Sequence, residues 1–287
     1  MTYVTSQGLR LWTSRSGSAD DPAILLVMGA AAQAVHWPAR FVRRLVEAGF
    51  QVIQYDHRDV GQSDLVDFDA SPYTMFDMVT DAVAVLDGLS VETAHIVGTS
   101  GGGVMAQWLA AAMPNRVRTL TLMNTTPLDG DPASLPPPDP AFLAGAEALD
   151  DLPRTTAAQR IDVEIRFYSL FTNSPHFDRP AARHMAKQAV ERAQDWTHAA
   201  NHYRAGDGPE KPPSLSAIKS PTLVLSADSD PIFPPPHAAA LASAIPNARL
   251  QPVPGLGHMM LAVNQPDHVA DLILTHLTAN SSVRGLS

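Results

Sequence analysis

Short apolar runs alternate along the chain with longer stretches in which apolar residues recur every three or four positions. The runs are rich in aliphatic residues, stop at turn residues, and cover residues 23–28, 52–55, 94–97, 117–123 and 222–225. Runs of this kind are typical of strands buried within a parallel sheet. Helical spacing fits residues 39–48, 75–86, 104–113, 236–245 and 268–277. The alternation predicts an α/β domain in which helices cover both faces of a mostly parallel sheet.

One region, residues 127–213, breaks this alternation because it contains no clear buried strand. It begins with the proline-rich segment DPASLPPPDP (131–140), which is incompatible with a regular helix or a central strand. Helix-like patterns follow at residues 161–171 and 180–203. We interpret residues 127–213 as a helical cap inserted into one α/β core, which comprises residues 1–126 and 214–287. A second independent domain is the alternative, but the region is amphipathic and has few core residues.

Composition narrows the classes of function. The 287-residue chain has 20 Lys and Arg against 29 Asp and Glu, a net charge of −9, which argues against a nucleic-acid or anionic membrane surface. It has no Cys, and therefore no disulfide, thiolate nucleophile or Cys-ligated metal. The N-terminal residues lack an apolar core of signal-peptide length, and the longest apolar run, residues 23–32, is too short to cross a bilayer. We expect a soluble, cytoplasmic protein that needs no cofactor; the pattern does not specify an oligomeric state.

The segment IVGTSGGGVMAQ (96–107) places Ser100 in a G-x-S-x-G motif between a strand-like and a helix-like run. A nucleophile elbow requires this context, because the serine is held on a strained strand-to-helix turn. Gly98 and Gly102 would let strand and helix approach closely, and the helix N-terminus would direct N–H groups at developing negative charge. A glycine-rich turn with an incidental serine is the alternative on local sequence alone.

A serine hydroxyl needs a base to become a nucleophile, and the base needs an orienting carboxylate. Two aspartates, Asp228 and Asp230, follow the predicted strand at 222–225. His258 lies in the glycine turn VPGLGHMM (253–260), after a short predicted strand at 249–253. It is the only one of the 11 histidines that follows the last predicted strand in a glycine turn and precedes the last helix. The order Ser, Asp, His along the chain is the one expected for a nucleophile elbow of this kind.

Acyl transfer also needs hydrogen-bond donors for an oxyanion and a pocket for the substrate. We assign the donors to the backbone N–H groups of Gly101, after the serine, and Ala30, in the small-residue loop MGAAAQAVHWP (28–38). A plain strand-to-helix loop is the alternative for the second donor. The cap aromatics could line a pocket or form the cap's own core. The candidate pocket residues are Gly29, Trp37, Phe167, Phe171, Trp196 and Met259.

His198 and His202 have a zinc-like spacing of i and i+4 in the predicted cap. The zincin pattern is absent because no Glu follows the first of them, and no third ligand is evident. We therefore expect a surface pair and no metal site.

Five stretches resemble the α/β-hydrolase superfamily over nearly the full chain, with the closest likeness to methylesterases of the aclacinomycin type. They are VMGAAAQAVHWP (27–38), QVIQYDHRDVGQSD (51–64), DAVAVLDGLSVETAHIVGTSGGG (81–103), PTLVLSADSDPIFPPPH (221–237) and IPNARLQPVPGLGHMM (245–260). Enzymes of that type remove a methyl ester from anthracycline polyketides. The resemblance implies an α/β-hydrolase fold and a serine esterase.

The resemblance also bears on individual residues. It selects Asp230, because the family acid precedes a proline and a hydrophobic residue. Asp56, Arg58 and Ser63 match the D-x-R-x-x-G-x-S turn and are expected to brace loops. Gly101 departs from the Met that many relatives carry after the serine, and the cap matches no family motif.

Together the residues and the resemblance predict an esterase with the triad Ser100, Asp230 and His258. The expected substrate is a small-molecule ester, such as a methyl ester of a polyketide-type or other hydrophobic compound. The same triad would support lactone opening, C–C bond hydrolysis or perhydrolysis, and a non-hydrolytic binding protein or biosynthetic cyclase is the alternative outside these enzymes. Ser100 argues against dehalogenases and epoxide hydrolases, which carry Asp at the elbow.

Overall fold

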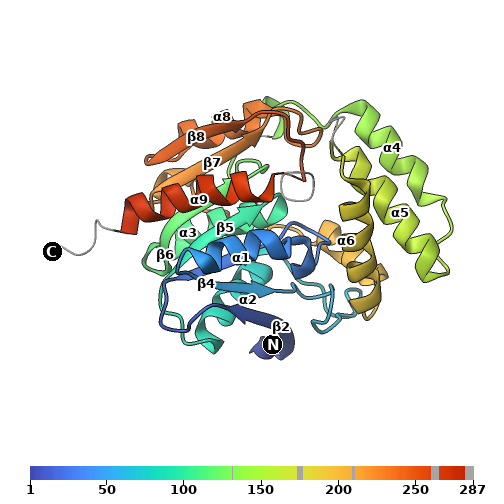
Figure 1. Ribbon diagram of the computed structural model, residues 1–287, viewed down its shortest axis with the longest axis horizontal. Helices are drawn as coiled ribbons and strands as arrows, with labels where there is room; N and C mark the ends of the chain where they lie inside the picture. Colours follow the sequence, from blue (N-terminus) through green and yellow to red (C-terminus); the bar gives the residue numbers. More distant parts are fainter. Residues whose placement is uncertain (131, 173–176, 209–210, 260–264, 282–287) are drawn as a thin grey trace.

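The computed structural model describes residues 1–130, 132–172, 177–208, 211–259 and 265–281 of the chain. Within these residues eight strands form one sheet in the order β1-β2-β4-β3-β5-β6-β7-β8 (Figure 1). Strand β2 pairs antiparallel with both β1 and β4, and the other neighbours pair parallel. The strands are β1 (Thr2–Ser6), β2 (Leu9–Ser16), β3 (Ala23–Val27), β4 (Gln51–Tyr55), β5 (Ala94–Thr99), β6 (Val117–Met123), β7 (Thr222–Ala227) and β8 (Ala248–Val253).

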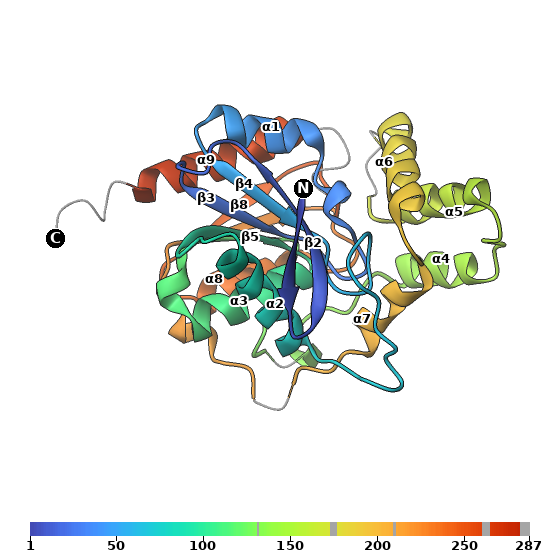
Figure 2. The same ribbon diagram turned by 90° about the horizontal axis from the view of Figure 1, so that it is seen from below.

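Helices cover both faces of the sheet, as the alternation of patterns predicts. Figure 2 shows α1 and α9 on one face and α2, α3 and α8 on the other. No helix in the described part of the chain combines the length and apolar character needed to cross a membrane. The helices are α1 (Ala39–Glu47), α2 (Met75–Gly88), α3 (Gly101–Ala112), α4 (Pro140–Asp150), α5 (Ala157–Leu170), α6 (Arg179–Arg192), α7 (Asn201–Arg204), α8 (Pro235–Ala244) and α9 (Pro266–Ser281).

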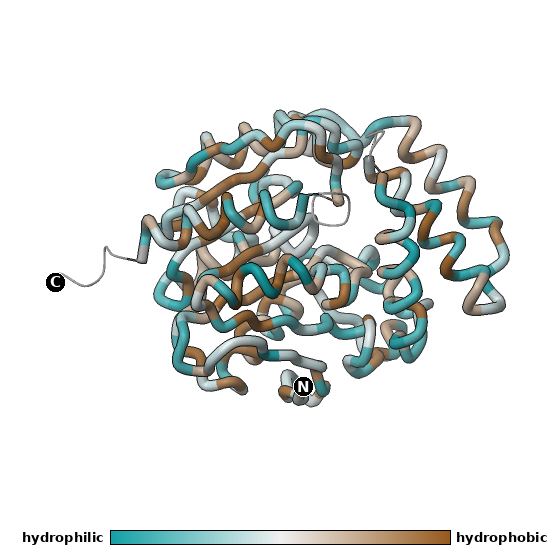
Figure 3. Tube along the Cα trace, in the orientation of Figure 1, coloured by the Kyte–Doolittle hydropathy of each residue, from teal (hydrophilic) through white to brown (hydrophobic). Residues whose placement is uncertain are grey.

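Successive side chains of a strand point to opposite faces of the sheet, which explains why the central strands are apolar without interruption. Ile24 and Leu26 of β3 belong to the core beneath α1 and α9, whereas Leu25 and Val27 belong to the core beneath α2 and α3. All four side chains are buried. Hydrophobic positions accordingly follow the central strands in Figure 3. A strand buried on both faces shows a continuous apolar run rather than an alternating one.

Among the described residues between β6 and β7 are four helices, α4 to α7, which we call the cap helices. Figure 1 shows α4, α5 and α6 to one side of the sheet. Three of them start at side-chain caps: Asp139 accepts from the N–H of Ala141 at α4, Thr156 and Gln159 form a capping box at α5, and Asp178 accepts from the N–H of Ala181 at α6. These helices fall within the predicted cap of residues 127–213, although the domain boundaries themselves stay a prediction.

Three features of the fold differ from the sequence analysis. Strands β1 and β2 and helix α4 were not predicted. Only two of the five residues of β1 are buried, so this strand carries little apolar signal. The helix predicted over 180–203 is instead α6, a turn and α7. Ala193 is extended (φ −67°, ψ 131°), and the Asp195 carboxylate accepts from the N–H of Thr197 at 2.9 Å, which starts a new helical segment.

Side chains at the end of α6 fasten the cap helices to the core. Arg192 makes an ion pair with Asp56 at 2.8 Å, and its guanidinium lies 4.5 Å from the ring centroid of Trp12. The Gln33 amide donates to the carbonyl of Ala189 at 2.9 Å. The end of α6 therefore binds both the loop after β3, through Gln33, and the loop after β4, through Asp56.

A buried ion pair joins the loop after β4 to α2. Arg58 Nε donates to Asp81 Oδ2 at 2.7 Å and Arg58 Nη2 to Asp81 Oδ1 at 2.8 Å. The two side chains are 4% and 0% exposed. Burial raises the pKa of the Asp81 carboxyl, and the hydrogen bonds and charge of Arg58 oppose that rise. Each charge is therefore compensated only while its partner is present.

Replacing Arg58 by Met should lower the free energy of unfolding by about 3–5 kcal/mol, because it leaves Asp81 buried without a cation. Arg44→Met is the matched control, since the pair of Arg44 with Asp271 has side chains 45% and 50% exposed. Its expected cost is about 0–1 kcal/mol. Urea unfolding followed by tryptophan fluorescence measures both values. Equal losses in the two variants would contradict this account.

Candidate active site

Ser100 occupies a strained turn between β5 and α3. Its φ of 53° and ψ of −129° place a non-glycine residue at positive φ, which costs about 1–3 kcal/mol. Hydrogen bonds hold the peptide there. The Ser100 N–H donates to the carbonyl of Met123 at 3.0 Å, and the Ser100 carbonyl accepts from Gly103 N at 2.9 Å and Thr125 Oγ1 at 2.7 Å.

The glycines around Ser100 are required by close backbone packing. A Cβ on Gly98 would lie 2.5 Å from the carbonyl oxygen of Gly102, and a Cβ on Gly102 would lie 2.2 Å from that of Met28. A Cβ on Gly103 would lie 2.6 Å from Cβ of Thr125. These contacts are closer than a methyl group allows, so β5, α3 and the loop after β3 can meet only through glycine.

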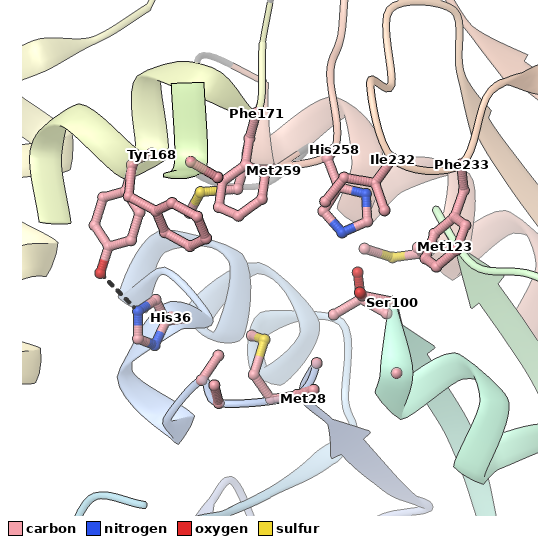
Figure 4. Close-up of a pocket in the computed structure, with 18 of the residues that line it drawn as sticks. Met28, His36, Ser100, Met123, Tyr168, Phe171, Ile232, Phe233, His258 and Met259 are labelled. Carbon is pink, nitrogen blue, oxygen red and sulfur yellow. Dashed lines mark hydrogen bonds between the residues drawn. The ribbon is translucent and has the colours of Figure 1, made fainter. Parts of the chain in front are cut away.

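The structure brings the two other predicted catalytic side chains together. His258 Nδ1 lies 2.8 Å from Asp230 Oδ2, and the Asp230 side chain is 0% exposed. The second oxygen of Asp230 accepts from the N–H groups of Ile232 at 2.8 Å and Phe233 at 3.0 Å. The carboxylate therefore holds the Nδ1 side of the imidazole, which leaves Nε2 for another partner. In Figure 4 the hydroxyl of Ser100 is directed toward this ring.

The neighbouring aspartate has a different environment. Asp228 is exposed, and its carboxylate accepts from the N–H of Gly255 at 3.0 Å. It braces the turn before His258 rather than the imidazole. The geometry therefore favours Asp230 over Asp228 as the partner of His258.

The backbone around His258 is held by residues from two other parts of the chain. The His258 N–H donates to the carbonyl of Phe171 at 2.8 Å, and a Cβ on Gly257 would lie 2.2 Å from the same oxygen. The buried side chain of Asn124 donates to the carbonyls of Gly257 at 2.9 Å and His258 at 2.8 Å, and it accepts from Ala227 N at 3.2 Å. Asn124 thus links the ends of β6 and β7 to the loop after β8 that carries Gly257 and His258, which we call the histidine loop.

Asn124 was not predicted from the sequence. The available signal was its position directly after a buried strand, where a polar side chain lies at the carboxyl edge of the sheet. Its role depends on the loop after β8, more than a hundred residues further along the chain, which no local pattern connects to it.

The two predicted oxyanion donors lie side by side. A Cβ on Gly101 would lie 3.2 Å from the backbone nitrogen of Ala30. Gly101 is the first residue of α3, where N–H groups have no acceptor within the helix. Among the described residues, the N–H of Ala30 has no hydrogen-bond acceptor. Both N–H groups are therefore available next to Ser100.

The loop that carries Ala30 is held by two buried imidazoles. The N–H of Ala31, which has a φ of 60°, donates to Nδ1 of His202 at 2.9 Å, and His202 Nε2 donates to the carbonyl of Arg58 at 2.8 Å. His57 Nε2 donates to the carbonyl of Met28 at 2.9 Å. Burial lowers the pKa of His202 to about 4 and that of His57 to about 4. Both rings are thus neutral near pH 7, and Nδ1 of His202 remains an acceptor.

The expectation of a surface pair at His198 and His202 is wrong. His202 is buried, and both of its ring nitrogens are engaged by the backbone. His198 is half-buried and lies against the carbonyl of Val66 at 3.2 Å. Across the described ranges, no group of three or more His, Cys, Asp or Glu side chains is arranged to hold a metal ion.

A cavity of about 560 Å³ contains these groups. Ser100, His258, Ala30 and Gly101 line it, and Figure 4 shows the first two facing each other across it. Four candidate pocket residues also line it: Gly29, Phe167, Phe171 and Met259. The polar lining residues that were not selected from the sequence include His36, Thr99, Glu164 and Tyr203. They come from separate elements, so no spacing in the sequence relates them.

Two candidate pocket residues lie elsewhere. Trp37 is 2% exposed and stacks on Phe41 of α1 at 5.5 Å, inside the core. Trp196 lies on the cap beneath the guanidinium groups of Arg154 and Arg160, at 5.8 Å and 5.4 Å. Neither is among the described residues that line the cavity. Their apolar surface is used for packing within the core and within the cap.

The D-x-R-x-x-G-x-S turn braces loops, as the resemblance implied. Asp56 accepts from the N–H groups of Ala34 at 2.8 Å and Gln62 at 3.0 Å. Ser63 Oγ donates to the carbonyl of Asp56 at 2.7 Å, and Arg58 forms the buried pair described above. None of Asp56, Arg58 and Ser63 is among the described residues lining the cavity.

The sheet is mostly parallel, a serine lies on a strained strand-to-helix turn, and a buried imidazole–carboxylate pair lies beside the same cavity. This is the arrangement of serine hydrolases of the α/β-hydrolase type. Residues 22–265 match the family model described as the alpha/beta hydrolase fold. The chain therefore belongs to the α/β-hydrolase family, and the predicted fold class is confirmed.

Curated relatives agree with the resemblance to methylesterases. Rhodomycin D methylesterase DnrP from Streptomyces peucetius is 35% identical, with 96% of this chain and 97% of the relative covered. Rhodomycin D methylesterase DauP from Streptomyces sp. (strain C5) is 34% identical with the same coverage. The prediction of a carboxylic ester hydrolase is thereby confirmed at the level of reaction class.

Solved structures share the fold at lower identity. An esterase from Exiguobacterium antarcticum has a TM-score of 0.77 at 20% identity, with 96% of this chain and 99% of that chain covered. The enol-lactonase from Burkholderia xenovorans has a TM-score of 0.74 at 24% identity, with the same coverage.

Replacing Asp230 by Asn should lower kcat for an activated ester about 10⁴-fold, because an amide stabilises the wrong imidazole tautomer and no imidazolium. Asp228→Asn is the matched control, and its kcat should stay close to that of the unchanged protein. Initial rates with p-nitrophenyl acetate measure both. A larger loss in the Asp228 variant would reassign the acid.

Replacing Asn124 by Ala should lower kcat about 10- to 100-fold with little change in KM, because the histidine loop loses its anchor and a small displacement of a catalytic group is costly. Asn247→Ala is the control, since Asn247 is exposed and its amide donates to the carbonyl of Lys219 at 3.3 Å, away from the cavity. Steady-state kinetics separate kcat from KM. Equal effects on kcat in the two variants would show that Asn124 does not position the loop.

Proposed function

We propose that this protein is a serine esterase that hydrolyses a methyl ester of a hydrophobic, ring-bearing small molecule. The observation that carries the proposal is the 2.8 Å contact between Asp230 Oδ2 and Nδ1 of His258, a residue that lines the same cavity as Ser100. The two methylesterase relatives, matched over nearly their whole length, support the choice of ester.

In the first half of the reaction, His258 Nε2 takes the proton of Ser100 as the hydroxyl oxygen attacks the ester carbonyl. Asp230, buried and bound to Nδ1–H, stabilises the imidazolium that forms. The N–H groups of Ala30 and Gly101 donate to the oxyanion of the tetrahedral intermediate. His258 then protonates the leaving oxygen, methanol departs, and an acyl-enzyme remains on Ser100.

In the second half, His258 takes a proton from water, which attacks the acyl carbonyl. The same two N–H groups stabilise the second oxyanion. The intermediate collapses with return of the proton to Ser100, and the carboxylic acid leaves. The orienting contacts of Asp230 stay in place throughout, because the carboxylate holds Nδ1 in both protonation states of the ring.

The cavity walls suit a hydrophobic acid with a planar ring system. Phe142 stacks on Phe171 at 5.6 Å, and Phe167 meets Phe171 edge-on at 4.7 Å. The ring of Phe171 lies 5.4 Å from that of His258, so this aromatic wall begins beside the reacting atoms. Such rings offer a flat apolar surface on which an aromatic acyl group can stack.

Apolar groups also flank the catalytic residues on the opposite side. In Figure 4, Phe233 and Met123 lie on the far side of His258 from Tyr168. The ring of Phe233 is 5.7 Å from that of His258. We assign the methyl leaving group to this side, because it offers apolar contact for a small alcohol.

Ser100→Ala should reduce turnover of p-nitrophenyl acetate and of an aromatic methyl ester by about 10⁴- to 10⁶-fold, because it removes the nucleophile but keeps the oxyanion donors. Initial rates and methanol release measure the two reactions. Ser71→Ala, at an exposed serine away from the cavity, is the matched control.

Covalent labelling gives a second readout of the same proposal. A fluorophosphonate should add to the Ser100 peptide of the unchanged protein, as identified by mass spectrometry, and should not label Ser100→Ala. Undiminished ester hydrolysis in Ser100→Ala, or labelling at a different serine, would remove the basis of the mechanism.

A further inference from the structure

The cavity has a polar end remote from Ser100. His36 Nε2 and the hydroxyl of Tyr168 lie 2.9 Å apart, and Figure 4 shows this pair well away from Ser100. Glu164 lines the same cavity, and the Tyr168 hydroxyl acts to lower the pKa of its carboxyl. Among the described lining residues, Glu164 is the sole carboxylate. A carboxylate in a mainly apolar cavity calls for a hydrogen-bond donor.

The local hydrogen bonds leave the Glu164 carboxylate short of donors. Nδ1 of His36 lies 3.0 Å from both the N–H and the carbonyl oxygen of Gln33, so either ring tautomer is accommodated. In both cases Tyr168 has a single hydroxyl proton to donate, whereas a carboxylate has about four acceptor positions. Tyr168 therefore cannot saturate Glu164.

No cation in the described residues completes the site. None of their ion pairs includes Glu164. Arg154 is near enough to lower the pKa of Glu164, but its guanidinium donates to the carbonyls of Asp150 at 3.1 Å and Leu152 at 3.4 Å. Burial outweighs these contacts and raises the pKa of the Glu164 carboxyl. A bound donor would offset part of that desolvation.

Glu164 is half-buried and not fully enclosed. Tyr203 lines the cavity, is 71% exposed, and is influenced by the charge of Glu164. The polar end is thus beside the exposed Tyr203. A substrate whose ester lies at Ser100 would place its remote end beside Glu164.

We infer that the cavity takes esters that carry a hydrogen-bond donor, a hydroxyl or a protonated amine, at the end remote from the ester, and that Glu164 accepts this hydrogen bond. The inference rests on the proposed function for the position of the ester, but binding of the donor to Glu164 does not require catalysis. Glu164 thereby acts as a specificity residue and not as part of the reaction.

The test compares methyl biphenyl-4-carboxylates that differ only at the 4′ position: hydrogen, hydroxyl, methoxy or aminomethyl. Methoxy can accept but not donate, so it is the matched probe for hydroxyl. Glu164→Gln should lower the ratio of kcat/KM for the hydroxyl ester over the methoxy ester, and for the aminomethyl ester over the unsubstituted ester, by about tenfold each, since hydrogen bonds to a charged group are the stronger ones. A drop confined to the aminomethyl ester would identify charge as the dominant recognition element.

Glu147→Gln is the matched control variant, because Glu147 is exposed on α4 and is not a lining residue. Its ratios should equal those of the unchanged protein. Equal ratios in the Glu164 and Glu147 variants would overturn the inference.

Binding measurements separate this inference from the proposed reaction. In calorimetric titrations of Ser100→Ala, the hydroxyl ester should bind about tenfold more tightly than the methoxy ester, and the aminomethyl ester about tenfold more tightly than the unsubstituted ester. The double variant with Ser100→Ala and Glu164→Gln should show neither difference. If the unchanged protein hydrolyses none of the esters, the proposed function fails while these titrations still decide the role of Glu164. Equal Kd values for donor and non-donor esters would end the inference even if hydrolysis is fast.

Discussion

The close backbone packing around Ser100 is the constraint on which the remaining site geometry depends. The loop after β3, the end of β5 and the start of α3 approach so closely that Gly102 would place a Cβ 2.2 Å from the carbonyl of Met28. A Cβ on Gly29 would lie 3.0 Å from that of Ser100. This contact fixes the serine, the N–H of Gly101 and the N–H of Ala30 relative to one another. The conformational cost at Ser100 is offset by hydrogen bonds to Met123 at the end of β6, to Thr125 just after it and to Gly103 in α3.

The acid and base reach this turn from the other half of the sheet, and the cap helices connect the two groups. Asn124 ties the end of β6 to the histidine loop, while the carbonyl of Phe171 accepts from the His258 N–H. On the opposite side, His202 holds the N–H of Ala31 beside the oxyanion donors. Phe171, which lines the cavity, therefore also positions His258. A change in the cap can alter turnover as well as selectivity, because the same peptides serve both.

The sequence was informative where a single physical requirement leaves a local mark. Strands such as β3, buried on both faces, are apolar throughout, and the glycines near Ser100 are demanded by packing. β1 was missed because it lies at the sheet edge with few buried positions. The break after α6 was missed because Asp195 starts a new turn by a side-chain hydrogen bond, which hydrophobic periodicity does not register. Trp37 and Trp196 were misplaced because an aromatic residue fits a core, a cap surface or a pocket equally well, and only the tertiary fold decides.

Two carboxylates beside one cavity illustrate how environment assigns different roles to one functional group. Asp230 is surrounded by donors: two backbone N–H groups on one oxygen and the imidazole on the other. Its acceptor positions are directed inward, so it can orient His258 but cannot bind a ligand. Glu164 has the single proton of Tyr168 near it, and burial raises its pKa. A carboxylate in that condition gains more from a new donor than one already saturated, because its desolvation is less compensated. The number of nearby hydrogen-bond donors therefore distinguishes the two carboxylates. Asp230, which has several donors, orients the catalytic imidazole, and Glu164, which has few, is available to bind a donor on the substrate.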